Sequence, residues 1–199
     1  MNIKVGSALA AWGVEAAADP RQTPWQRFVD EVAEVGYEWI ELGSPGYLPA
    51  QPAHLRCELE ARGLKAAGGF AMPHLEDRTA WAALEQTVLA IGAQLAELCA
   101  GHLVLIDDKY ILLPATSPYS TPAFAEDAWQ ILIEATHTTA RPVREKFGLR
   151  LVFHPHTEMH VEYEPQIERF LADTNPAWVG LCLDTGHHTY RGGDPVTLI

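Results

Sequence analysis

The sequence has no long apolar run and few cysteines, and these two absences exclude several classes of protein. No run approaches the roughly 18 apolar residues that a membrane helix needs, and the first ten residues lack the charged-then-apolar layout of a signal peptide. The three cysteines are far apart and form no C-x-x-C pair, which favours reduced thiols over a disulfide framework or a thiolate zinc site. We therefore expect a cytoplasmic protein without a membrane partner.

Positive charge is scarce as well. The 199 residues include 14 Lys and Arg against 26 Asp and Glu, a formal net charge of −12, and no Lys/Arg cluster reverses that balance locally. A field of this sign opposes the approach of phosphate backbones, so nucleic acid is not an expected partner. With 48% hydrophobic residues, the chain has enough apolar side chains for a substantial core.

Short apolar or β-branched segments alternate with longer amphipathic ones along the whole chain. The pattern predicts strands at residues 3–6, 39–42, 64–69, 102–106, 149–153 and 179–183. It predicts helices at residues 24–35, 52–62, 79–98, 123–147 and 165–172, and the start of another at 194–195. Strands and helices that alternate in this way are typical of parallel βαβ units.

Two prolines allow more specific predictions about the helices. Thr23 is predicted to cap the first helix, with Pro24 at its first position, where the missing N–H costs nothing. Pro142 lies inside the fourth helix and is expected to bend or break it.

A parallel α/β chain forms either an open doubly wound sheet or a closed (β/α)8 barrel. No G-x-G-x-x-G or G-x-x-x-x-G-K-[ST] motif follows any predicted strand, whereas polar residues collect after the second, fourth, fifth and sixth strands. Six units in 199 residues extrapolate to roughly 265 residues for eight, inside the range of TIM barrels. We predict a single barrel-type domain over residues 1–199 with about six of eight βα units, truncated at the C-terminus. Its unpaired edge strands predict a homo-oligomer.

The segment 154–162, after the fifth strand, holds three histidines and two glutamates. His154 and His156 face the same side of an extended backbone, and imidazole with carboxylate suits manganese, cobalt, iron or zinc. The alternative is a solvated polar loop in which the histidines bond to backbone.

A second polar cluster follows the sixth strand. Asp184 comes directly after a buried apolar run, which is costly unless a cation or hydrogen-bond donors compensate it. Gly186 permits a tight turn that returns His187 toward the same mouth of the barrel. The alternative is that Asp184 only caps the next turn.

The runs H-P-H…V-E, L-D-T-G-H and G-G-D-P together resemble the xylose-isomerase-like TIM barrels, which include sugar-phosphate isomerases and epimerases and inosose dehydratases. The resemblance implies one divalent ion, Mn²⁺, Co²⁺, Mg²⁺ or Zn²⁺, held by residues after strands five to eight. Glu162 matches the first ligand and Asp184 the second, while His187 matches a substrate-contacting histidine. Two carboxylates alone bind such an ion weakly, so the chain by itself need not be active.

The resemblance further implies a sugar or sugar-phosphate isomerase or epimerase that abstracts a proton next to a carbonyl. Glu162 is then both metal ligand and catalytic base, and His187, His156 and Glu41 contact the substrate. Glu41 has the equal alternative of a buried or capping carboxylate. Many relatives carry Gly-Thr where this chain has Glu158 and Met159.

Three other functions remain open from the sequence. The first is an inosose dehydratase-type lyase, which shares the early steps of the isomerase reaction. The second is a non-catalytic fragment or a sugar- or metal-binding remnant. The third, the apurinic endonuclease branch of the same superfamily, needs three metals and a basic DNA face, and the acidic balance of the chain opposes it.

Overall fold

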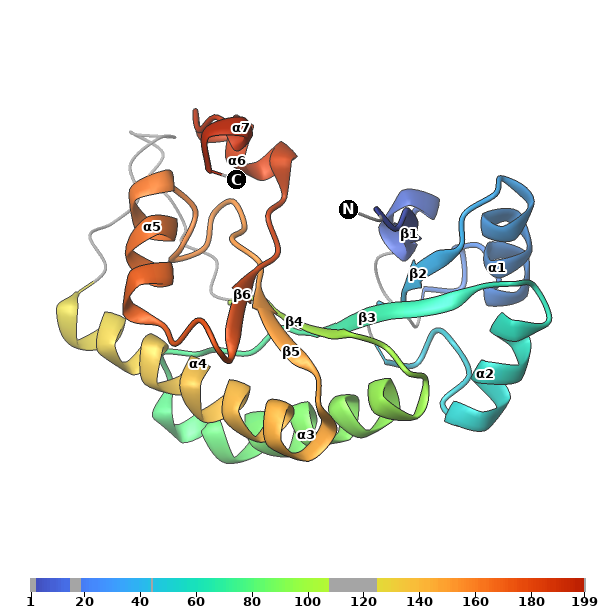
Figure 1. Cartoon of the computed structure of the whole chain (residues 1–199), viewed down its shortest axis with the longest axis horizontal. Helices are drawn as coiled ribbons and strands as arrows, with labels where there is room; N and C mark the ends of the chain where they lie inside the picture. The colour runs from blue at the N-terminus through green and yellow to red at the C-terminus, as the bar shows by residue number, and fades with distance from the viewer. Residues whose placement is uncertain (1–2, 15–18, 44, 108–124, 199) are drawn as a thin grey trace. The chain divides into compact units, whose positions relative to one another are not determined.

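The computed structural model describes residues 3–14, 19–43, 45–107 and 125–198. In these ranges strands alternate with helices along the chain (Figure 1). The strands are β1 (Gly6–Ala8), β2 (Trp39–Glu41), β3 (Lys65–Ala71), β4 (His102–Leu105), β5 (Arg150–Phe153) and β6 (Val179–Leu181). The helices are α1 (Trp25–Glu34), α2 (Pro52–Glu60), α3 (Trp81–Glu97), α4 (Glu126–Phe147), α5 (Glu164–Asp173), α6 (Thr185–Tyr190) and α7 (Pro195–Leu198), with 3-10 turns η1 (Leu9–Trp12) and η2 (Arg78–Ala80). None of these helices is long and apolar enough to cross a membrane.

The sheet has the order β1-β2-β3-β4-β5-β6, so each strand neighbours the next one along the chain. The pairs β1–β2, β2–β3 and β5–β6 are parallel. Doubly wound sheets reverse their strand order at a switch point, whereas a barrel adds strands in one direction. The observed order is that of a barrel, as predicted, and it is carried by six strands in the described ranges.

The chain forms two compact units, and the prediction of a single domain over residues 1–199 stays a prediction. The first comprises Met1–Phe70 and Ala90–Leu103, and the second comprises Ala71–Leu89 and Val104–Ile199. The core of the first unit is apolar and fully buried, with Phe28, Val29, Ile40, Leu55 and Leu103 among its members.

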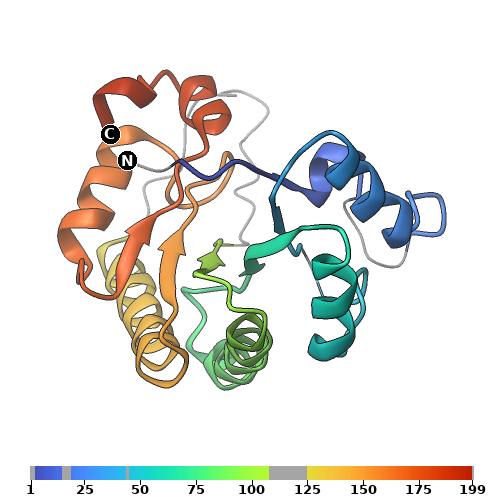
Figure 2. The same ribbon diagram turned by 45° about the vertical axis from the view of Figure 1, so that its right-hand side comes forward.

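The second unit carries the polar strand ends and is organised around β5 and β6. Helix α4 packs against β5 and α5 against β6, and Figure 2 shows the two strands side by side. The rings of Phe153 and Phe170 lie 4.1 Å apart between centroids, and both side chains are buried. Burial of this kind stabilises the unit by about 1.5–3 kcal/mol for each large apolar side chain.

The first strand begins later than predicted. Residues 3–6 were expected to form it, but β1 runs from Gly6 to Ala8, and Ile3 and Val5 are 78% and 61% exposed. Pairing explains the difference, because Gly6 lies opposite Trp39 at the start of β2. A Cβ atom on Gly6 would come within 2.6 Å of the Trp39 carbonyl oxygen, so only glycine permits this approach.

The prediction for Pro24 needs correction, and Pro142 does not break its helix. Pro24 is the N-cap of α1 rather than its first helical residue, no side chain caps the helix, and the Thr23 carbonyl instead accepts a 2.7 Å hydrogen bond from the Tyr47 hydroxyl. Helix α4 continues through Pro142 without a break. The flanking residues Ala140 and Val143 are completely buried, and their packing offsets the cost of about 3 kcal/mol for an interior proline.

Candidate functional site

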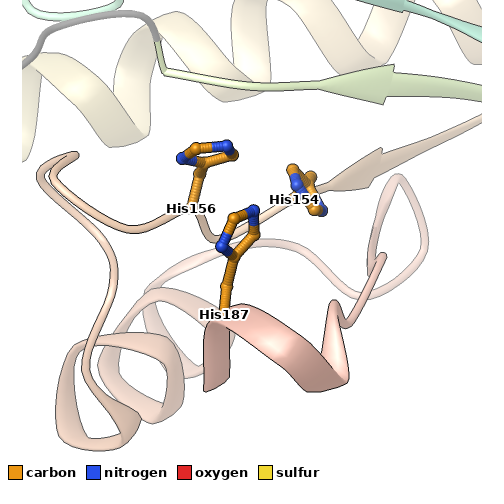
Figure 3. A group of neighbouring side chains, drawn as sticks. All are labelled: His154, His156 and His187. Carbon is orange, nitrogen blue, oxygen red and sulfur yellow. The ribbon is translucent and has the colours of Figure 1, made fainter. Parts of the chain in front are cut away.

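Three histidines gather where β5 and β6 end. His154 and His156 follow β5 directly, and His187 lies in the first turn of α6, after β6. One ring nitrogen of each lies within 4.8 Å of the others, and the rings of His156 and His187 are 3.9 Å apart between centroids. Figure 3 shows the three side chains turned toward one another. We call this group the histidine cluster.

The sheet itself positions His154. The His154 amide donates to the Leu105 carbonyl at 2.9 Å, and the Cys182 amide donates to the Phe153 carbonyl at 2.7 Å. These bonds extend the parallel ladder past the last residues of β5 and β6. Because parallel strands end at the same edge of a sheet, residues that follow them are brought together there.

Hydrogen bonds select the tautomers of two of the histidines. Nδ1 of His154 lies 3.2 Å from the Cys182 carbonyl oxygen, and Nδ1 of His156 lies 2.8 Å from the Thr157 carbonyl oxygen. A carbonyl can only accept, so Nδ1 carries the hydrogen and a neutral ring keeps its lone pair on Nε2. Metal-binding histidines are commonly oriented by a partner of this kind.

Asp184 lies beside the histidine cluster and is the N-cap of α6. Its Oδ1 accepts a 2.8 Å hydrogen bond from the His187 amide, and its Oδ2 lies 3.8 Å from His187 Nε2. The capping role considered as the alternative is therefore present. It engages one carboxylate oxygen with an amide, and the predicted role of Asp184 as a metal ligand stays a prediction.

The surroundings set the charge states of the cluster. Burial lowers the pKa of His154 and of His187, and the nearby His156 lowers both further, while Asp184 acts in the opposite direction. Burial alone would raise the pKa of Asp184, but the His187 amide and the neighbouring His187 and His154 rings outweigh it, so this pKa is lowered. At neutral pH, neutral imidazoles thus stand beside an ionised carboxylate, a donor set that suits manganese, iron, cobalt or zinc.

Glu162 has a different environment. The residue is buried, and its Oε2 accepts 2.7 Å hydrogen bonds from the Glu158 amide and from Arg191 Nε. Arg191 is the C-cap of α6, and its side chain is 4% exposed, so this buried ion pair ties the loop after β5 to the end of α6. Two groups of three metal-ligating side chains occur in the described ranges, and neither contains Glu162 or Asp184. Ligation and base catalysis by Glu162 remain predictions.

The turn that Glu162 holds is conformationally strained. Glu158 has a φ of 66°, in the left-handed region that glycine adopts easily and other residues adopt at a cost. The hydrogen bond from the Glu158 amide to Glu162 holds that conformation in place.

Glu41 lies in the first unit, at the end of β2, with Oε1 accepting a 2.9 Å hydrogen bond from the Gly43 amide. Burial raises the pKa of this carboxyl, and the hydrogen bond from Gly43 only partly opposes that rise. The capping role proposed as its alternative is present, and contact with substrate stays a prediction.

A second group of possible metal ligands consists of Glu76, Asp107 and His160, which follow β3, β4 and β5 respectively. No pattern in the sequence joins these three residues. His160 lies in the polar segment 154–162, and Asp107 is an acidic residue close after a buried strand, but neither observation links them to each other or to Glu76. Arg191 was also not predicted, since nothing in the sequence pairs it with Glu162.

The family model described as "Xylose isomerase-like TIM barrel" matches residues 29–199. The chain belongs to the xylose isomerase-like TIM barrel family. The predicted resemblance and the predicted barrel class are thereby confirmed.

Curated members of the xylose isomerase-like family align with the whole chain. An inosose dehydratase of Salmonella typhimurium is 26% identical over 211 residues, covering 100% of this chain and 66% of the relative. The rhizopine catabolism protein MocC of Rhizobium meliloti is 30% identical over 204 residues, covering 100% of this chain and 60% of the relative. The chain therefore spans about two thirds or less of the length of these relatives.

Two solved structures share the fold of this chain. The probable 3-DHS dehydratase AsbF from Bacillus anthracis gives a TM-score of 0.76 at 12% identity, covering 98% of this chain and 68% of that one. The D-psicose 3-epimerase from Clostridium cellulolyticum gives a TM-score of 0.69 at 15% identity, covering 92% of this chain and 64% of that one. At these identities the similarity shows the fold alone.

Proposed function

We propose that this chain carries part of a divalent-metal-dependent active site that abstracts a proton next to a carbonyl of a sugar or cyclitol. The observation that carries the proposal is the histidine cluster beside Asp184 at the ends of β5 and β6. We also propose a cytoplasmic location, which the reduced thiols of Cys57 and Cys99 support.

The side chains fit a divalent ion by their chemistry. We assign His154 and Asp184 to the ion, because Nε2 of His154 keeps its lone pair and Asp184 is ionised. A bound divalent ion would supply Lewis-acid stabilisation of negative charge on substrate oxygens. Nitrogen donors favour zinc, cobalt, iron or manganese over magnesium.

His156 and His187 would act on the substrate. The His156 ring, whose Nδ1 is held by a carbonyl, presents Nε2 as a hydrogen-bond acceptor for a substrate hydroxyl. His187 is held neutral by burial and lies near the ionised Asp184, which would stabilise its imidazolium form. A neutral imidazole next to a carboxylate is suited to accept a proton and return it. Glu162 would instead keep the loop after β5 in place through its hydrogen bonds with Arg191 and Glu158. It would act on the substrate only if these bonds opened.

Dehydration of an inosose is favoured over epimerisation by the curated relatives, since those 26% identical over the full chain bear that name. Both reactions begin with the same proton abstraction. Dehydration then expels the β-hydroxyl, whereas epimerisation returns the proton to the other face. Epimerisation is the second candidate, because the fold is shared with solved epimerases.

One experiment separates these candidates. The chain is incubated with Mn²⁺, Co²⁺ or Zn²⁺ and either 2-keto-myo-inositol or a panel of ketoses in D₂O. Dione absorbance reports dehydration, and deuterium at the carbon next to the carbonyl reports proton exchange. We expect exchange that His187→Ala reduces by about 100-fold or more, with the exposed Glu85→Gln as control. Metal binding without exchange on any substrate would indicate a non-catalytic remnant and contradict the proposal.

A further inference from the structure

Glu76, Asp107 and His160 lie together in the second unit, and none of them belongs to the histidine cluster. One ligand atom from each side chain lies within 4.8 Å of the others. We propose that these three residues form a second divalent-cation site. The two groups share no residue, so this inference does not depend on the proposed function.

Asp107 supplies the strongest observation. It is 1% exposed, and its Oδ2 accepts from His160 Nδ1 at 2.5 Å and from the His160 amide at 3.4 Å. Its other oxygen, Oδ1, is buried, and no hydrogen-bond donor of the described residues reaches it. A buried carboxylate oxygen without a donor is unfavourable, and a cation is a partner that would remove this cost.

The charges of the group point to a divalent ion. Carboxylate oxygens of Glu76 and Asp107 fall within the same 4.8 Å group, so two negative charges approach each other in a largely buried place. A protonated His160 would balance only one of them, whereas a divalent cation balances both. One imidazole nitrogen with two carboxylate oxygens suits manganese, iron, cobalt or zinc.

The distances between the three ligand atoms would allow them to coordinate one ion after small side-chain rotations. Ligand atoms about 2.1 Å from an ion lie roughly 3 to 4 Å from one another. The 2.5 Å contact between His160 Nδ1 and Asp107 Oδ2 would widen, and any proton held there would be released to solvent when the ion binds. The ion would also fix His160, four residues after His156, and so restrain the loop that carries part of the histidine cluster.

The test measures how many ions each chain retains. The full chain is dialysed against Zn²⁺ or Mn²⁺ and its metal content is measured, with thermal melting as the control for folding. We expect two ions for the wild type and one for Glu76→Gln or Asp107→Asn, with affinity at this site reduced by about 10- to 100-fold or more. His154→Gln should remove the other ion, and Glu85→Gln, on the exposed face of α3, should remove neither.

Three results would overturn the inference. The first is a wild type that retains only one ion, lost in His154→Gln. The second is a wild type without any bound ion. The third is a metal content that Glu76→Gln leaves unchanged. If Asp107→Asn does not fold, Glu76→Gln alone decides the test. Glu76 is only half-buried, so its substitution should disturb folding less. A wild type that retains a single ion, lost in Glu76→Gln but not in His154→Gln, would count against the proposed function and leave this inference standing.

Discussion

Glu162 and Asp184 follow neighbouring strands, but their surroundings are opposite. Glu162 is buried, and a guanidinium and an amide already satisfy its Oε2. The side chain of Asp184 is 39% exposed, and it stands beside imidazoles that are neutral at pH 7. A carboxylate with a fixed cationic partner gains little from a metal ion, whereas one beside neutral nitrogen donors gains much. We therefore propose a structural role for Glu162 and a metal-binding role for Asp184.

The largest effect should come from breaking the Glu162–Arg191 pair. Arg191→Met leaves a buried carboxylate without its cation, which should lower the free energy of unfolding by about 3–5 kcal/mol in urea titrations. The matched control is Arg141→Met, whose 2.9 Å bond to Glu145 is exposed, with 63% and 58% of the two side chains accessible. That pair should contribute no more than about 1 kcal/mol. Equal effects in the two variants would show that Glu162 needs no cation.

Exchanging the two carboxylates for amides tests the comparison directly. Asp184→Asn should weaken metal binding about 100-fold or more in calorimetric titrations, while stability changes by less than about 1 kcal/mol because asparagine also caps helices. Glu162→Gln should leave metal affinity unchanged and lower stability. Were Glu162→Gln to weaken metal binding as strongly as Asp184→Asn, the predicted ligand role of Glu162 would be upheld.

The parts of the molecule that follow from local pattern could be predicted, and the parts that need long-range contacts could not. Periodicity and strand order predict the barrel class, because each βα unit buries its own apolar face. The same logic brings His156 and His187 together, since both follow neighbouring parallel strands. Register is not local, and the close approach of Gly6 to Trp39 moves the first strand by three residues.

The remaining contacts of the site join residues that are far apart in the sequence. Asp107 and His160 are 53 positions apart, and Glu162 and Arg191 are 29 apart. Neither pair follows from the alternation of side chains along a strand, because Asp107, His160 and Glu162 lie beyond the strand ends. The positive φ of Glu158 likewise cannot be predicted from the sequence, because it depends on the conformation of the turn.

A smaller effect is expected at the turn that Glu162 holds. Glu158→Gly should remove the strain of a φ of 66° and raise the free energy of unfolding by about 1 kcal/mol. The control is Glu168→Gly on the exposed face of α5, which should lower it by about 1 kcal/mol because glycine weakens helices. A higher melting temperature for Glu158→Gly and a lower one for Glu168→Gly would support backbone strain at Glu158. A lower melting temperature for both variants would contradict it.

The smallest effect concerns Glu41, a third carboxylate at a strand end, which has neither the guanidinium of Glu162 nor the imidazoles of Asp184 among its hydrogen-bond partners in the described ranges. Burial raises its pKa in the folded state, so the stability that its protonated form contributes is present below about pH 4.3 and is lost as the pH rises through the folded value. Glu41→Gln mimics the protonated form and should melt higher than the wild type at pH 7–8, with the difference vanishing toward pH 4. Glu85→Gln, at an exposed position, should show no such dependence. A Glu41→Gln variant that melts lower at pH 7 would mean that the folded chain stabilises the ionised carboxylate, as a substrate- or cation-binding residue requires.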